Sequence, residues 1–112
     1  GVKKNKFIFG LPGNPVSSFN MFELLVKPLV FKMMGNNYNP PQIKLPLGTT
    51  YSRNKSARRS FLPVKIEDGK VFPINYHGSA HIFALTEATG LISIPVGVSE
   101  LKEGEVVDVR QI

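Results

Sequence analysis

The sequence predicts an α+β chain, in which a strand, loop and helix of the α/β type precede a small all-β, barrel-like domain. Three observations support this fold class. A short apolar run at residues 6–9 ends in a glycine and is followed by a loop with two prolines. An apolar segment with helical spacing then covers residues 16–34. From residue 42 onward, short apolar runs alternate with turn residues, a pattern that is typical of strands.

In the first part of the chain, residues 6–9 are predicted to form a short buried strand of the kind found in parallel sheets. Asn14 is a favourable helix N-cap, and Pro15 suits the first helical position because its φ angle is already helical. We expect an irregularity at Pro28, which lacks a backbone N–H, and a helix end at Gly35. The apolar face of this helix should contain Phe19, Phe22, Val26, Leu29, Val30 and Met33.

The second part follows residues 36–41, whose sequence Asn-Asn-Tyr-Asn-Pro-Pro has the composition of a linker. Residues 42–112 are predicted to form the barrel-like domain. The motif Glu67-Asp68-Gly69 is a hairpin signal between two of its strands. A short helix or turn is expected at residues 79–89. The expected strands are residues 43–47, 61–66, 70–76, 91–95 and 106–112.

Composition restricts the classes of function. The 112 residues are 42% hydrophobic and 20% charged, which is typical of a folded domain. The absence of cysteine excludes disulfides and thiolate metal sites. The net charge of +6 favours an acidic partner such as phosphate, an oxyanion or nucleic acid. No signal peptide is visible, and polar residues interrupt the apolar segment too often for a membrane span, so we expect a cytoplasmic location without membrane contact.

The loop at residues 10–17 is a candidate anion site because it leads into a helix N-terminus with unsatisfied amides. Gly13 would let a ligand approach the backbone, and Ser17 adds a hydroxyl. The same spacing also fits a plain helix start without a ligand, which is the commoner case. The loop is neither a dinucleotide nor a triphosphate fingerprint.

A second candidate is the cluster of Arg53, Lys55, Arg58 and Arg59. Such clusters are usually solvated loops, but the planar fork of arginine also suits an oxyanion. Nucleic acid is the less favoured ligand, because no recognised binding motif is present. The histidines at positions 77 and 81 have the spacing of a metal pair but lack a third ligand, so no metal site is expected.

The run Gly10-Leu11-Pro12-Gly13-Asn14-Pro15-Val16-Ser17, with Phe22-Glu23-Leu24 and Pro28 after it, resembles the end of the central domain of molybdopterin molybdenumtransferases, the MoeA and gephyrin family. The similarity continues through Arg58-Arg59-Ser60-Phe61, Gly78-Ser79, Ala88-Thr89-Gly90-Leu91-Ile92 and Gly104-Glu105-Val106-Val107-Asp108-Val109. These later motifs resemble the C-terminal β-domain of the family in their order and spacing. The resemblance therefore covers nearly all of the chain.

The resemblance implies the C-terminal portion of an enzyme that inserts molybdate into adenylylated molybdopterin, releasing AMP and forming molybdenum cofactor. In the family a divalent cation such as Mg²⁺ takes part, and the full-length protein is expected to be a homodimer. Residues 1–35 would be the last strand and helix of the molybdopterin-binding α/β domain. Because the acidic metal and pterin motifs of the family lie upstream, the fragment is expected to hold no cofactor and to be inactive alone.

The resemblance also implies site residues. It selects Arg58 and Ser79 for molybdate, although the adjacent Arg59 leaves open which arginine binds the oxyanion. No catalytic residue and no metal ligand is assigned. The residues implied to line the cleft are Pro12, Gly13, Asn14, Pro15 and Ser17. Two other functions remain as alternatives, a peptide-binding scaffold of the gephyrin type and a small basic nucleic-acid binder.

Overall fold

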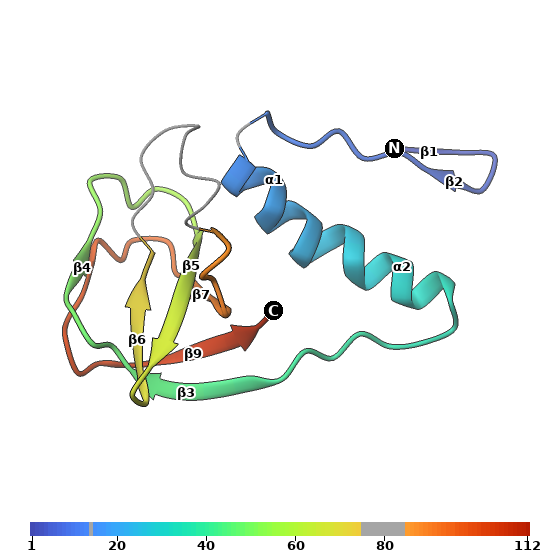
Figure 1. Cartoon of the computed structure of the whole chain (residues 1–112). Helices are drawn as coiled ribbons and strands as arrows, with labels where there is room; N and C mark the ends of the chain where they lie inside the picture. Colours follow the sequence, from blue (N-terminus) through green and yellow to red (C-terminus); the bar gives the residue numbers. More distant parts are fainter. Residues whose placement is uncertain (14, 75–84) are drawn as a thin grey trace. The chain divides into compact units, whose positions relative to one another are not determined.

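The computed structural model describes residues 1–13, 15–74 and 85–112 (Figure 1). These residues form two compact units, Gly1–Asn39 and Pro40–Ile112. The first unit contains one interrupted helix, and the second contains a five-stranded antiparallel sheet. The predicted α+β class is therefore confirmed.

The first unit opens with a short antiparallel hairpin of β1 (Val2–Lys3) and β2 (Lys6–Phe7). The prediction of a buried strand at residues 6–9 is wrong for the described structure. All the apolar residues of that run are exposed, and Ile8 reaches 61%. The physical reason is that a two-residue ladder provides no neighbouring strands to cover the two faces of the run.

The helix of this unit begins at Pro15, as predicted, and has three consecutive segments: α1 (Pro15–Met21), η1 (Phe22–Val26) and α2 (Lys27–Met33). The middle segment is π-helical, and the N–H of Lys27 donates to the carbonyl of Phe22, five residues back. This change of hydrogen-bonding pattern lies directly before Pro28, which has no N–H to donate. The predicted irregularity therefore takes the form of a π-helical turn.

The helix ends in a glycine cap. Gly35 has a φ of 84°, in the left-handed region that glycine adopts without steric penalty. Its N–H donates to the carbonyl of Lys32 at 3.0 Å, and the N–H of Asn36 donates to that of Phe31 at 2.9 Å. These two bonds form a Schellman motif and confirm the predicted helix end.

The predicted apolar face of the helix is not fully covered within the described residues. Phe22, Val30 and Met33 are exposed, so their predicted burial is wrong for this structure. The unit offers one helix and one short hairpin, which bring too few apolar groups together to cover a helix that is apolar on most sides. None of the helices in the described residues has the length and apolar run that crossing a membrane requires.

Lys27 ties the helix to the segment that follows it. Its Nζ lies 3.3 Å from a carboxylate oxygen of Glu23 and 5.1 Å from the ring centroid of Tyr38. The Tyr38 ring in turn lies 4.9 Å from the ring of Phe31. Burial lowers the pKa of Lys27, but hydrogen bonds to Tyr38 and Glu23 and the attraction of both groups outweigh it, so the pKa of Lys27 is raised.

We expect this contact to be lost in alkaline solution. Because the folded pKa of Lys27 exceeds the unfolded value of about 10.4, its stabilisation is fully present below that value and disappears as pH rises through the folded pKa. A carbon-13 NMR titration of Lys27 Cε measures the pKa, and helical circular dichroism from about pH 9 to about pH 12 measures the loss. In Lys27→Met this part of the pH dependence should vanish. An unchanged profile in that variant would contradict the assignment.

The second unit is built on the sheet order β3-β9-β7-β5-β6, in which every neighbouring pair is antiparallel. A second, two-stranded sheet pairs β4 with β8. All five predicted strands are present, whereas β4 and β8 were not predicted. The bounds are β3 (Gln42–Pro46), β4 (Tyr51–Ser52), β5 (Ser60–Glu67), β6 (Lys70–Pro73), β7 (Gly90–Ile94), β8 (Glu100–Leu101) and β9 (Val106–Gln111).

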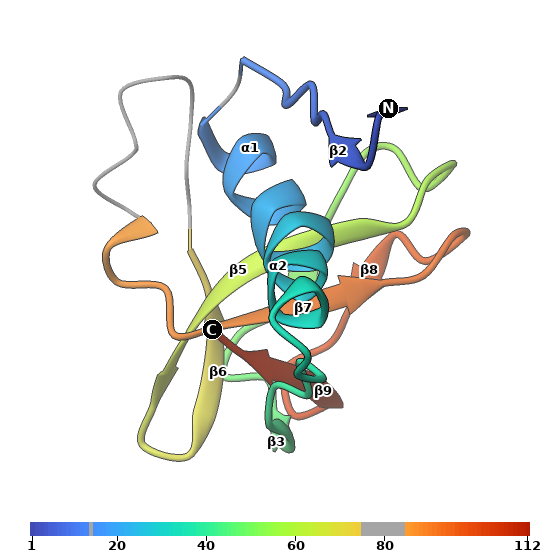
Figure 2. The same cartoon turned by 90° about the vertical axis from the view of Figure 1, so that its right-hand side faces the viewer.

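The five-stranded sheet curves so that its two edges meet at one end (Figure 2). Leu47, directly after β3, forms a parallel bridge with Val71 of β6, and the N–H of Gly48 donates to the Val71 carbonyl at 2.8 Å. This contact between the edge strands gives the unit its half-barrel form. It agrees with the barrel-like architecture expected from the evenly spaced strands.

The hairpin between β5 and β6 turns at Asp68 and Gly69, which have φ angles of 52° and 72°. Two consecutive positive φ angles match the twist of a two-residue hairpin, so the Asp-Gly signal is confirmed. Of the third predicted strand, residues 70–76, β6 covers Lys70–Pro73, and residues 75 and 76 lie outside the described part. Of the helix or turn expected at residues 79–89, residues 79–84 lie outside the described part, and Ala88 N–H closes a turn onto the Leu85 carbonyl.

The hydrophobic core of the second unit lies on the inner face of the curved sheet. Its buried members come from the sheet strands, from β8 and from the loop after β3. They are Leu47, Leu62, Val64, Val71, Ile92, Ile94, Leu101 and Val109. Alternation along β5 and β7 places every second side chain on this face.

Gly90 is a position where this core tolerates no side chain. A Cβ atom there would lie 2.5 Å from Cγ1 of Val109 and 3.1 Å from the carbonyl oxygen of Arg110. We expect Gly90→Ala to lower the free energy of unfolding by about 1–3 kcal/mol, because the buried Val109 side chain would have to shift and the Arg110 carbonyl oxygen leaves little room on the other side. Urea denaturation measures the effect. Gly10→Ala is the control, since a Cβ there meets no atom within 4 Å. Equal stability of the two variants would refute the steric account.

Candidate functional site

The loop before the helix is held by a residue that the sequence did not single out. Ser18 Oγ donates to the carbonyl of Pro12 at 2.6 Å, which ties the loop to the first turn of the helix. A serine in a first helical turn often bonds a nearby carbonyl, so its position was the available signal. Gly13 leaves open space where a Cβ would lie, so its backbone is accessible. Ser17, whose hydroxyl was predicted to contribute to the anion site in this loop, is partly buried.

The four cations of the second cluster lie in one loop, residues 53–59, which joins β4 to β5 and which we call the basic loop. The sequence alone does not distinguish the roles of its arginines, because all of them carry the same guanidinium group. The structure gives them different surroundings. Arg53 is half-buried, whereas Lys55, Arg58 and Arg59 are exposed.

Arg53 holds this loop together. Its guanidinium donates to the carbonyl oxygens of Val98 at 2.7 Å, Pro95 at 2.8 Å and Arg58 at 2.9 Å. It also donates to Oγ of Ser60 at 2.5 Å. Pro95 and Val98 belong to the turn after β7, so Arg53 bonds that turn and the end of the basic loop at once. Such a set of directed bonds suits the planar fork of arginine.

Arg58 and Arg59 differ in how their side chains are used. Nη1 of Arg59 donates to Oγ of Ser93 at 2.9 Å, on the exposed face of β7. The main chain of Arg58 is held by Arg53, while its side chain extends into solvent. In the part of the chain that the structure describes, the ion pairs are Lys27–Glu23, Lys44–Asp108 and Lys65–Glu67. The described carboxylates therefore leave the basic loop without a paired negative charge.

Several predicted site residues cannot be placed. Asn14, Ser79 and both histidines lie outside the described residues, and the side chain of Pro15 is also not described. Whether Ser79 lies near Arg58 therefore stays a prediction. Within residues 1–13, 15–74 and 85–112, no three histidine, aspartate or glutamate side chains gather as metal ligands. These residues do not fit a Mg²⁺ site, which requires oxygen ligands in octahedral array.

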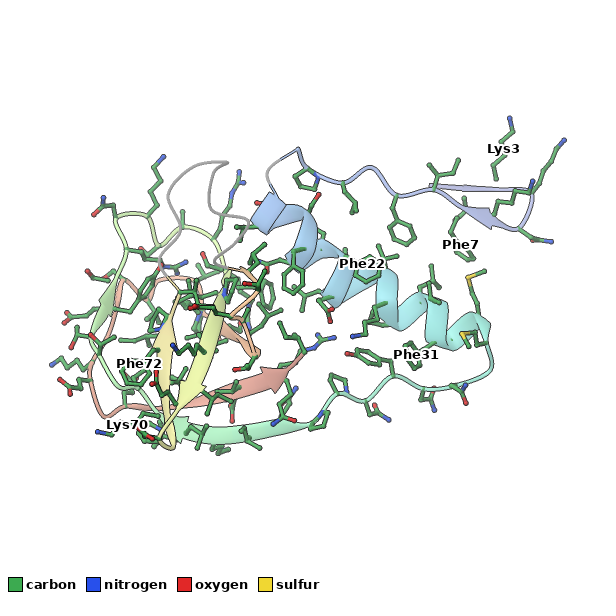
Figure 3. All side chains as sticks on the ribbon, in the orientation of Figure 1. Lys3, Phe7, Phe22, Phe31, Lys70 and Phe72 are labelled. Atoms are coloured by element: carbon green, nitrogen blue, oxygen red, sulfur yellow. The ribbon has the colours of Figure 1, made fainter. Side chains whose placement is uncertain are left out.

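A cavity of about 360 Å³ lies on the β1–β2 hairpin and contains none of the predicted site residues. It is lined by Lys3, Lys4, Lys6, Phe7 and Ile8. Figure 3 shows Lys3 and Phe7 on this hairpin. The candidate site of the first unit is the loop at residues 10–17, which Ser18 bonds at Pro12. The candidate site of the second unit is the basic loop.

The chain is similar to members of one family. The C-terminal region of MoeA, also termed domain IV, matches residues 44–112. The molybdopterin molybdenumtransferase of Staphylococcus epidermidis is 35% identical over 108 residues, which are 93% of this chain and 26% of that protein. The enzyme of Staphylococcus aureus is 33% identical over 109 residues. The chain therefore spans about a quarter of the length of the curated relatives it matches.

Solved structures agree with the sequence relatives. The molybdopterin biosynthesis MoeA protein of Pyrococcus horikoshii matches 99% of this chain and 27% of its own, with 38% identity and a TM-score of 0.84. A molybdenum cofactor biosynthesis protein of Pyrococcus furiosus matches 89% of this chain and 36% of its own, with 26% identity and a TM-score of 0.76. Together with the match to residues 44–112, these similarities show that the chain belongs to the family of the MoeA C-terminal region (domain IV).

Proposed function

We propose that the chain works as the C-terminal part of a molybdopterin molybdenumtransferase, which inserts molybdate into adenylylated molybdopterin and releases AMP. Family membership supports the activity, and the basic loop supports a role in binding the oxyanion. The single observation that carries the proposal is the contrast within this loop. Arg53 fixes the main chain of Arg58, while the exposed Arg58 side chain has no described carboxylate as a partner.

In this proposal Arg58 binds molybdate through its guanidinium. Two parallel N–H bonds from one arginine fit two oxygens of an oxyanion, and the positive charge strengthens both. Arg59 is the weaker candidate because its Nη1 is already bonded to Ser93. The hydroxyl of Ser79 is proposed as a second molybdate contact. The cleft wall is proposed to consist of Pro12, Gly13, Asn14, Pro15 and Ser17.

For the whole protein we propose the organisation that the family resemblance implies. Residues 1–35 would complete a molybdopterin-binding α/β domain, and residues 42–112 would form the C-terminal β-domain. Residues 36–41 would be the linker between these two domains. A cytoplasmic homodimer using Mg²⁺ is part of the same proposal. We propose no role for the described residues in holding that ion, because they do not fit a Mg²⁺ site.

A chimera tests the proposed function. In the Staphylococcus epidermidis enzyme, the region matching this chain is replaced by the chain itself, and the product is expressed in cells that lack their own molybdenumtransferase. We expect restored molybdenum-cofactor synthesis, measured as the activity of a molybdenum-dependent reductase. The same enzyme with the matching region deleted should stay inactive. A folded chimera that restores nothing would refute the proposal.

A further inference from the structure

Arg53 is the one arginine of the basic loop whose side chain bonds several segments at once. Its four acceptors are three main-chain carbonyls and one hydroxyl, and all are neutral. The ion pairs of the described residues do not include it. Arg53 therefore contributes a full positive charge beside Arg58 while it fixes the shape of the loop.

The position of the Arg58 main chain depends on this guanidinium, because the main-chain bonds of the basic loop lie earlier in it, beginning with the Arg53 N–H, which donates to the Ser99 carbonyl at 2.8 Å. Residues 53–59 lie between β4 and β5 and outside both ladders. The Arg58 carbonyl accepts from Arg53 at 2.9 Å, and Ser60 at the start of β5 accepts from the same nitrogen. The loop is also bonded at its middle, where Gly97 N–H donates to the carbonyl of Ser56 at 2.7 Å.

We propose that Arg53 is a positioning residue for oxyanion binding: it sets the main chain of Arg58 relative to the turn after β7, and its charge adds to the field that attracts the anion. The inference rests on the proposed function. A lysine at this position would keep the charge, but its single ammonium cannot bond all four acceptors in the geometry of the fork. Displacement of a binding group by about 1 Å can reduce a rate by about 100-fold.

The test uses the chimera and its initial rate of cofactor formation against molybdate concentration. We expect Arg53→Lys to raise KM for molybdate by about 10-fold while kcat changes little, and to lower the midpoint of thermal unfolding because hydrogen bonds of the basic loop are lost. In a background of Arg58→Ala, the same substitution should change KM by no more than about twofold, because there is no longer a guanidinium to position. Ser60→Ala, which removes one acceptor of Arg53, should raise KM in the same direction by a smaller factor.

The outcomes separate the two ideas. A chimera with the unchanged chain that folds but forms no cofactor overturns the proposed function and this inference together. A working chimera in which Arg53→Lys leaves KM unchanged overturns the inference alone. So does an equal factor in the presence and absence of Arg58, since a purely structural role would act in both backgrounds. If Arg53→Lys does not fold, Ser60→Ala decides: a raised KM supports the inference and an unchanged KM overturns it.

Discussion

Ile92→Ala is expected to lower the free energy of unfolding of the β-unit by about 2–5 kcal/mol. Ile92 is 1% exposed and lies in β7, where it pairs with Leu62 of β5 and Val109 of β9. Removing its side chain leaves a cavity in the core. The strands around this cavity cannot move in to fill it, because β7 is hydrogen-bonded to β5 on one side and to β9 on the other. A core of this size rarely supplies more than about 3–5 kcal/mol, so much of the protein should be unfolded at room temperature.

Urea denaturation followed by circular dichroism measures this loss. Val106→Ala is the control, because it removes an apolar side chain from β9 that is 60% exposed. We expect that variant to change the free energy of unfolding by less than about 0.5 kcal/mol. Ile92→Val should fall between them at about 0.5–1.5 kcal/mol. Equal losses for Ile92→Ala and Val106→Ala would mean that β7 is not at the centre of the core.

Arg58→Ala is expected to have the largest effect on function. In the chimera it should raise KM for molybdate by about 10- to 100-fold, the equivalent of hydrogen bonds to a charged group worth about 1.5–3 kcal/mol. Thermal stability should remain unchanged, because the Arg58 side chain is exposed and its carbonyl bond to Arg53 does not need the side chain. Initial rates at varied molybdate concentration measure the effect.

Two further variants decide whether the position of the positive charge matters. Lys70→Ala removes an exposed cation at the tip of the β5–β6 hairpin, at the opposite end of β5 from the basic loop (Figure 3). It should leave KM for molybdate unchanged. Arg59→Ala tests the neighbouring arginine. A larger rise for Arg59→Ala than for Arg58→Ala would move the oxyanion contact by one residue.

Most of the fold could be predicted because its signals are local. The alternation at residues 43–47, the Asp68-Gly69 turn and the glycine at position 35 each specify a backbone geometry without reference to distant residues. β4 and β8 could not be predicted, since two residues carry no periodicity. They exist because Tyr51 pairs with Leu101, far along the chain. The expected burial at residues 6–9 was wrong because burial depends on neighbours, and residue pattern does not reveal which neighbours are present.

The candidate site was predictable in residue type but not in role. Sequence placed Arg53, Arg58 and Arg59 in one cluster, where each could have faced an anion. Arg53 donates to the carbonyls of Pro95 and Val98, which belong to a turn about 40 residues further along the chain. Only folding brings this turn close to Arg53. Ser18 is a similar case, since its bond to Pro12 spans the start of the helix.

A crystal structure of the chimera soaked with tungstate, an oxyanion whose metal gives strong anomalous scattering, shows directly whether Arg58 binds the oxyanion. We expect a metal peak beside the basic loop, with Arg58 nitrogens about 2.7–2.9 Å from the oxygens of the anion and Arg53 still bonded to the Arg58 carbonyl. A peak held by other residues, with the Arg58 side chain left in solvent, would contradict it.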